Sequence, residues 1–122
     1  MKETMTIPQP ATLFIDSVNN QNPKNLHSVF APDAVVHDAG REIRGSEAIQ
    51  EWAENEIFAV NVSLEILDAV EHDGETLVTV KVDGTFDRTG LPDPLLMDQC
   101  FTIVGEKIVS LTCRLSETKP SH

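Results

Sequence analysis

The sequence is short of positive charge and contains no long apolar run, and each shortage excludes a class of protein. Nine Lys and Arg residues stand against twenty Asp and Glu residues, which gives a formal net charge of −11. An acidic surface without a basic cluster repels nucleic acid and anionic lipid, so we expect no nucleic-acid partner. No apolar run approaches the roughly 18–20 residues of a membrane-spanning helix, so we expect no membrane partner.

Cysteine and tyrosine are also scarce. Two cysteines, Cys100 and Cys113, are too few for a disulfide-dense secreted scaffold or a four-cysteine zinc site. The opening MKETMTIPQP has no apolar signal-peptide core. We therefore expect a cytoplasmic protein in which both thiols are reduced and are small buried apolar groups, with reactive thiols as the alternative. No cluster of three metal ligands is evident, and we expect no metal and no cofactor. There is no tyrosine at all.

What remains is an ordinary globular composition. The chain has 122 residues, of which 40% are hydrophobic. This length suits one domain with a single core. We predict one domain over residues 1–122, with its core at about 9–116 and loose ends at 1–7 and 117–122.

The first half of the chain has helical periodicity. Apolar residues at spacings of three and four predict a helix from about Pro8 to Asn19 and a second, short helix after Pro23. Ala34 to Asp38 is a short strand-like run. Ser46 opens a third helix whose apolar positions include Ile49, Trp52 and Ile57.

The second half alternates apolar and polar residues from Val62 onward, which predicts strands. The dipeptide Asp73-Gly74 is a strong hairpin signal, and Gly105-Glu106 is a plausible second two-residue turn. Helices gathered before a run of antiparallel strands indicate an α+β fold rather than a parallel α/β sheet.

Three segments resemble the nuclear-transport-factor-2-like superfamily, in its SnoaL-like and ketosteroid-isomerase-like branch. They are VNNQNPKNLHSVFAPDAVVHD (18–38), IRGSEAIQEW (43–52) and MDQCFTIVGEKIVSL (97–111). The resemblance implies an α+β roll of the cystatin-like kind. In it, a cone-shaped, curved antiparallel sheet wraps around three N-terminal helices and encloses a pocket. The superfamily hosts many chemistries, so fold alone does not fix function.

The resemblance also implies two catalytic carboxyls. Asp38 falls where ketosteroid isomerases have their general base, and Asp98 where they have a protonated acid that donates a hydrogen bond to the developing enolate. The position of their oxyanion tyrosine is Phe14 here. We therefore do not expect a standard ketosteroid isomerase.

The residues themselves leave alternatives for both carboxyls. Asp38 ends a strand and would point the same way as Val36, into the cone, or it could cap the turn at Ala39-Gly40. Asp98 lies within an apolar strand, and alternation alone does not say which face is inward. It is either a pocket acid or a solvated or salt-bridged surface residue. No Lys or Arg falls on the faces assigned inward.

Large apolar residues are assigned to the pocket or to the core beside it. If Gly105-Glu106 is the turn, residue 98 pairs with 113 and residue 100 with 111, which places both thiols on the face of Asp98. The predicted ligand-binding residues are Phe14, Val36, Trp52, Val82, Phe86, Cys100, Leu111, Cys113 and Leu115.

The functional expectation is a SnoaL-like protein with an apolar pocket for a small hydrophobic ligand. Its activity would be that of an isomerase, lyase or cyclase, with Asp38 moving a proton on a carbonyl compound. The alternative is a non-catalytic ligand-binding or dimerisation module of the same fold. Met97, Phe101 and Ile103 would lie on the face opposite Asp98, and this apolar patch predicts a homodimer through the outer face of the sheet.

Overall fold

The computed structural model describes residues 7–72, 74–86, 89–90 and 94–116. The predicted loose ends fall outside these ranges except for Ile7, which packs against the core. Among the described residues, no helix has the length and apolar character needed to cross a membrane.

The helices form where their periodicity predicts them. Helix α1 is Gln9–Asn19, with a proline in its first turn, and α2 is Pro23–Ser28, which Asn22 caps through its side chain. Helix α3, Ser46–Ala53, continues into a π-helical turn, η1, at Glu54–Phe58. Such π turns often lie at functional sites because they redirect side chains that a regular helix would place elsewhere.

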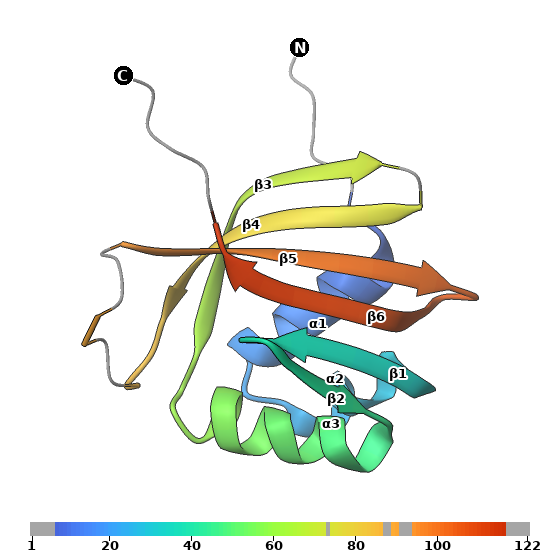
Figure 1. Cartoon of the computed structure of the whole chain (residues 1–122), viewed down its shortest axis with the longest axis horizontal. Helices are drawn as coiled ribbons and strands as arrows, with labels where there is room; N and C mark the ends of the chain where they lie inside the picture. Colours follow the sequence, from blue (N-terminus) through green and yellow to red (C-terminus); the bar gives the residue numbers. More distant parts are fainter. Residues whose placement is uncertain (1–6, 73, 87–88, 91–93, 117–122) are drawn as a thin grey trace.

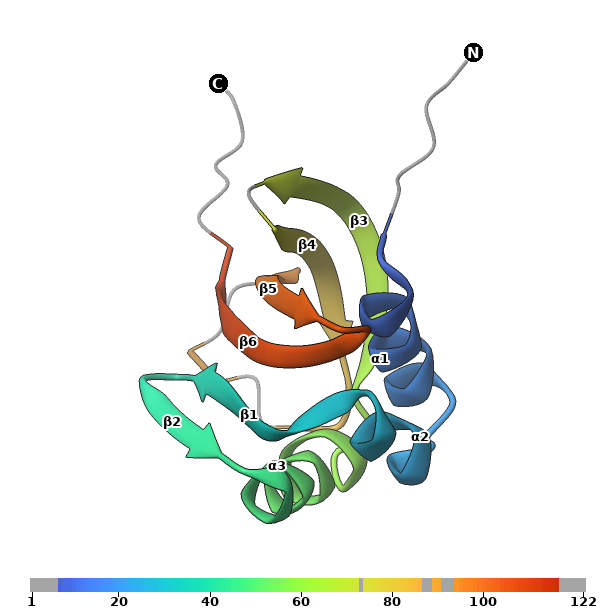
Figure 2. The same cartoon turned by 90° about the vertical axis from the view of Figure 1, so that its right-hand side faces the viewer.

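The strands form one curved, unclosed sheet, and Figures 1 and 2 show it bending over the helices. Its order is β2-β1-β6-β5-β4-β3. The β1–β6 pair is parallel and the other neighbours are antiparallel. The predicted α+β class is confirmed. The strands are β1 (Phe30–Asp38), β2 (Arg41–Arg44), β3 (Ser63–His72), β4 (Glu75–Asp83), β5 (Leu95–Val104) and β6 (Lys107–Leu115).

The core fills the space between the inner face of the sheet and α1. The ring of Phe14 packs edge-on against Phe30 and Phe101, with ring centroids 5.9 and 5.5 Å apart. Asn19, at the end of α1, holds β3 from its edge, since its side chain accepts from Leu64 N at 2.7 Å and donates to Leu64 O at 2.9 Å. One helix therefore fixes both the middle and the edge of the sheet.

The face assignment predicted for β5 is wrong. Leu95, Met97, Gln99 and Phe101 face inward. Asp98 faces outward, together with Leu96 and Cys100. The more apolar of the two alternating sets is the one that the sheet buries, as the hydrophobic effect requires.

The predicted hairpin turn is present, but the predicted pairing is not. Gly105 and Glu106 both have positive φ, as a two-residue type I′ turn requires. Ile103 pairs with Ile108, whereas Thr102 pairs with Ser110, so one extra residue in β6 bulges and shifts the register. Beyond this bulge Gln99, not Asp98, lies opposite Cys113.

The same correction removes the apolar patch on which the predicted homodimer rested. Phe101 is fully buried, Met97 lines a cavity on the inner face of the sheet, and Ile103 packs against the core. The outer face of β5 instead carries Leu96, Asp98, Cys100 and Thr102.

Candidate functional site

A cavity of about 180 Å³ lies between the inner face of the sheet, α1 and the α3–η1 segment. Most of its lining is apolar, and a few polar groups from separate elements reach it. The lining residues are Phe14, Val18, Asp38, Trp52, Glu56, Ile57, Val62, Leu64, Val82, Phe86, Leu95, Met97, Gln99 and Cys113. A concave, mainly apolar site with few polar groups is the usual form of a small-molecule site.

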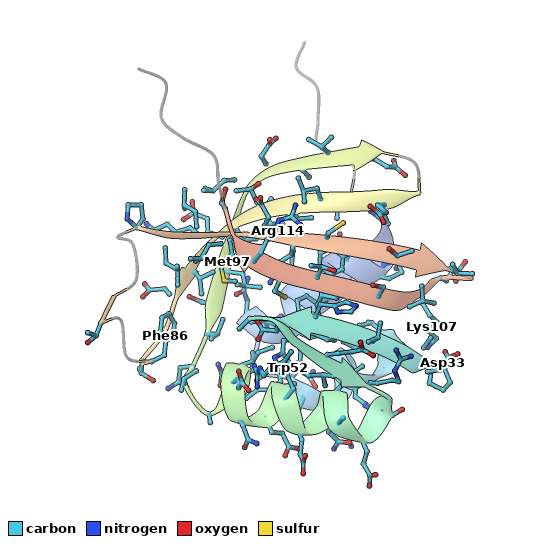
Figure 3. All side chains as sticks on the ribbon, in the orientation of Figure 1. Asp33, Trp52, Phe86, Met97, Lys107 and Arg114 are labelled. Carbon is cyan, nitrogen blue, oxygen red and sulfur yellow. The ribbon has the colours of Figure 1, made fainter. Side chains whose placement is uncertain are left out.

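Five of the predicted ligand-binding residues line this cavity: Phe14, Trp52, Val82, Phe86 and Cys113. They come from α1, α3, β4, the segment after β4, and β6. Figure 3 shows Trp52, Phe86 and Met97 contributed by different elements around this part of the molecule. The cavity is thus built by tertiary packing rather than by one local motif.

The other four predicted residues do not line it. Val36 and Leu111 are fully buried in the core. Cys100 lies on the outer face because of the β5 assignment above, and its thiol approaches Glu75 Oε1 at 3.5 Å. Leu115 lies near the end of β6 and is 45% exposed, since little of the core extends that far.

Asp38 ends β1 and reaches the cavity, on the same side as Val36, as predicted. Its side chain is 19% exposed, and the indole Nε1 of Trp52 donates a hydrogen bond to Oδ2 at 2.9 Å. The carboxylate is held by the side chains of Trp52 and Arg41. Among the described residues, it accepts no bond from the backbone of the turn at Ala39-Gly40, so the capping alternative is not supported.

The turn after Asp38 brings a cation to the carboxylate. Ala39 and Gly40 both have positive φ and join β1 to β2, so that Arg41 lies directly opposite Asp38. Arg41 Nη2 lies 3.3 Å from Asp38 Oδ2. The expectation that no Lys or Arg falls on the inward faces is therefore wrong. Residues directly opposite each other in an antiparallel hairpin place their side chains on the same face of the sheet, so Arg41 shares the face of Asp38.

Arg41 also binds Glu56, at the rim of the cavity. Its Nη1 and Nη2 donate to the two carboxylate oxygens of Glu56 at 2.8 and 2.7 Å, a paired geometry that Arg favours. The hydrogen bonds to Glu56 raise the pKa of Arg41 above its ordinary value. Two carboxylates and one guanidinium leave the rim with one net negative charge. The π turn η1 carries Glu56, whose role the sequence pattern does not signal.

Asp98 does not reach the cavity. It lies on the outer face between Thr79 and Arg114 of the neighbouring strands, and Thr79 Oγ1 donates to its Oδ1 at 2.9 Å. Figure 3 labels Arg114, which pairs with Asp98 in the register. The structure therefore does not bring Asp38 and Asp98 together, and the surface alternative describes Asp98 correctly.

Gln99 is the polar residue of β5 that does line the cavity, and sequence reasoning missed it. It is 6% exposed, and among the described residues its Oε1 has no hydrogen-bond partner. The signal was available in the strand itself: Gln99 alternates with Leu95, Met97 and Phe101, the more apolar set.

The two thiols are free, and Cys113 is buried as predicted. The prediction that Cys100 is also buried is wrong, because Cys100 lies on the outer face of β5 and is only partly covered. Burial raises the pKa of Cys113 above its ordinary value of 9.0, and the charge of Asp38 raises it further. Burial also raises the pKa of Cys100, with a second contribution from its hydrogen bond to Glu75. Both are thus protonated at neutral pH, which disfavours the reactive alternative. The described residues contain no group of three His, Cys, Asp or Glu side chains arranged to hold a metal ion.

Comparison with known families and structures supports the resemblance. The family model of the SnoaL-like domain matches residues 11–111. A Sinorhizobium meliloti protein, provisionally named a polyketide cyclase, is 29% identical with a TM-score of 0.80, over 88% of this chain and 95% of its own.

Two further structures share the fold. A Catenulispora acidiphila protein with a ketosteroid-isomerase-like fold, solved in complex with trimethylamine, is 25% identical with a TM-score of 0.75, over 92% of this chain and 88% of its own. A nuclear-transport-factor-2-like protein of Cytophaga hutchinsonii is 13% identical with a TM-score of 0.73, over 95% of both chains. No curated protein matches the chain.

Proposed function

The chain belongs to the SnoaL-like domain family, and we propose that it binds a small apolar carbonyl compound in its cavity and moves a proton on that compound with Asp38. One observation carries the proposal. Asp38 is a carboxylate in an otherwise mainly apolar cavity, and Trp52 and Arg41 both contact its Oδ2. Among the described residues, no hydrogen bond engages Oδ1, which leaves that oxygen for a ligand.

The reaction class follows from what a carboxylate can do beside a carbonyl compound. Asp38 takes a proton from the carbon next to the carbonyl, and the electron pair of that C–H bond forms the C=C bond of an enolate. The negative charge moves to the carbonyl oxygen. Where the enolate is conjugated with a further C=C bond, return of the proton to the far carbon of that system gives an isomer. Where the β carbon carries a leaving group, the group departs with its bonding electron pair, which gives a lyase reaction. Positioned proton transfer of this kind contributes about 10²–10⁴-fold to a rate.

The volume of the cavity limits the ligand. A cavity of about 150 Å³ holds benzene, and this one measures about 180 Å³. A compound with one substituted ring fits within this space, whereas a four-ring steroid would extend out of it toward solvent. The absence of tyrosine and the outward position of Asp98 also argue against the standard ketosteroid isomerase mechanism.

The second candidate is a non-catalytic module that binds a ligand in the same cavity. The contact between Arg41 and Asp38 favours it, because the guanidinium already occupies Oδ2 of the carboxylate that would take the proton. The rim's net negative charge would suit a ligand with an amine, and the Catenulispora relative was solved with trimethylamine.

One experiment separates the two candidates. The probe is 3-cyclohexenone, a single-ring ketone with acidified α protons, in D₂O. NMR follows both its binding and the exchange of its α protons. Catalysis predicts exchange above the buffer rate in wild type and a loss of at least about 10²-fold in Asp38→Asn. Binding without exchange in wild type would establish the non-catalytic module, and no binding would reject both.

A further inference from the structure

Gln99 is a buried polar side chain whose amide oxygen receives no hydrogen bond from any donor among the described residues. Its side chain is 6% exposed and lines the cavity, and Oε1 has no hydrogen bond among the described residues. A buried amide oxygen without a donor costs free energy, and native proteins keep such groups rare. The proposed mechanism does not use this oxygen.

The register of the sheet fixes which strand positions lie beside Gln99. The register places it between Val78 of β4 and Cys113 of β6, and Cys113 also lines the cavity. Asp38 pairs with Cys113 on the other side of β6, so the order across the inner face is Asp38, Cys113, Gln99. Two strand spacings of roughly 4.8 Å separate the Asp38 and Gln99 backbones, about the length of a single substituted ring.

We propose that Gln99 selects the ligand: its Oε1 accepts a hydrogen bond from a hydroxyl or N–H group that the ligand carries on the side away from Asp38. This inference rests on the proposed binding of a single-ring compound in the cavity and names its chemical class. The ligand is an apolar ring with a reacting carbonyl side near Asp38 and a hydrogen-bond donor near Gln99. Without a ligand, a water molecule can satisfy Oε1, since the cavity holds one easily.

The test uses p-cresol and p-xylene, which have nearly the same shape and differ by OH in place of CH₃. Their dissociation constants are measured for wild type, for Gln99→Met, which keeps the length of the side chain, and for Asp38→Asn. We expect the preference for p-cresol over p-xylene to fall about fivefold in Gln99→Met, the value of one net hydrogen bond. It should persist in Asp38→Asn, which would show that the negative charge of Asp38 is not what selects p-cresol.

A second measurement needs no variant at Gln99. In wild type, p-cresol should shift the side-chain amide resonances of Gln99, and p-xylene should leave them near their free positions. An unchanged p-cresol preference in Gln99→Met would overturn the inference, because water alone would then satisfy Oε1. Proton exchange on 3-cyclohexenone tests Asp38 separately. The role of Gln99 in selecting p-cresol can therefore be rejected while proton transfer by Asp38 is confirmed, and proton transfer can be rejected while the selectivity is confirmed.

Discussion

Asp38 and Asp98 lie on opposite faces of one sheet, and each accepts a hydrogen bond of 2.9 Å from a neutral side chain. The donor to Asp38 is an indole at an apolar cavity, whereas the donor to Asp98 is the hydroxyl of Thr79 on the outer face. Similar local contacts therefore surround two carboxylates with different access to a ligand. The face of the sheet, and not the residue type, decides which of them could take part in chemistry.

The largest difference between the faces should appear in stability. Phe101 is fully buried against Phe14, so Phe101→Ala removes a packed ring and leaves a cavity. We expect it to lower the free energy of unfolding by about 3–5 kcal/mol. The next residue, Thr102, faces outward, and Thr102→Ala should cost well under about 1 kcal/mol. Urea denaturation of both variants measures this, and equal losses would mean that the assigned faces are wrong.

The two hydrogen-bond donors give a smaller contrast. Trp52→Phe removes the indole N–H from Asp38 at a half-buried site, and bonds to charged groups contribute about 1.5–3 kcal/mol. We expect a loss near the lower end of that range. Thr79→Val removes the hydroxyl from Asp98 in a similar shape and should cost about 0.5 kcal/mol, since solvent can replace it there. Thermal unfolding compares the two variants, and a larger loss in Thr79→Val would contradict the contrast.

The thiols offer the smallest effect, which depends on pH. Burial raises the pKa of Cys113 above its ordinary value of 9.0, so the folded thiol keeps its proton where the unfolded thiol loses it. Ionisation then favours the unfolded chain, and stability falls as pH rises above 9.0. Between pH 8 and pH 10 we expect wild type to lose about 1 kcal/mol more than Cys113→Ala.

Cys100 serves as the control for this effect. Its pKa is raised in the same direction, but its side chain is only partly buried. Cys100→Ala should therefore change the slope of stability with pH less than Cys113→Ala does. A larger change in Cys100→Ala would contradict the assignment of Cys113 as the more deeply buried thiol.

The fold could be predicted because its signals are local. Helical spacing, the change to alternation at Val62 and the Gly105-Glu106 turn each depend on a few neighbouring residues, and each corresponds to an element of the structure. The position of Asp38 could be predicted for the same reason, since strand alternation carries it inward with Val36.

The partners of the site residues depend on features that are not local. One extra residue in β6 changes every cross-strand partner beyond it, so that Gln99, and not Asp98, lies opposite Cys113. Arg41 meets Asp38 only because Ala39 and Gly40 form a tight turn, and Glu56 reaches the rim only through the π turn after α3. These features arise from backbone geometry that residue type alone does not signal.

The most direct test of the central claim is a comparison of the two aspartates in one reaction. Asp38→Asn and Asp98→Asn each remove one negative charge and keep the shape of the side chain. Exchange of the α protons of 3-cyclohexenone in D₂O should fall by at least about 10²-fold in Asp38→Asn and stay at the wild-type rate in Asp98→Asn. Equal rates in the two variants, or a loss confined to Asp98→Asn, would contradict the assignment of the chemistry to the inner face.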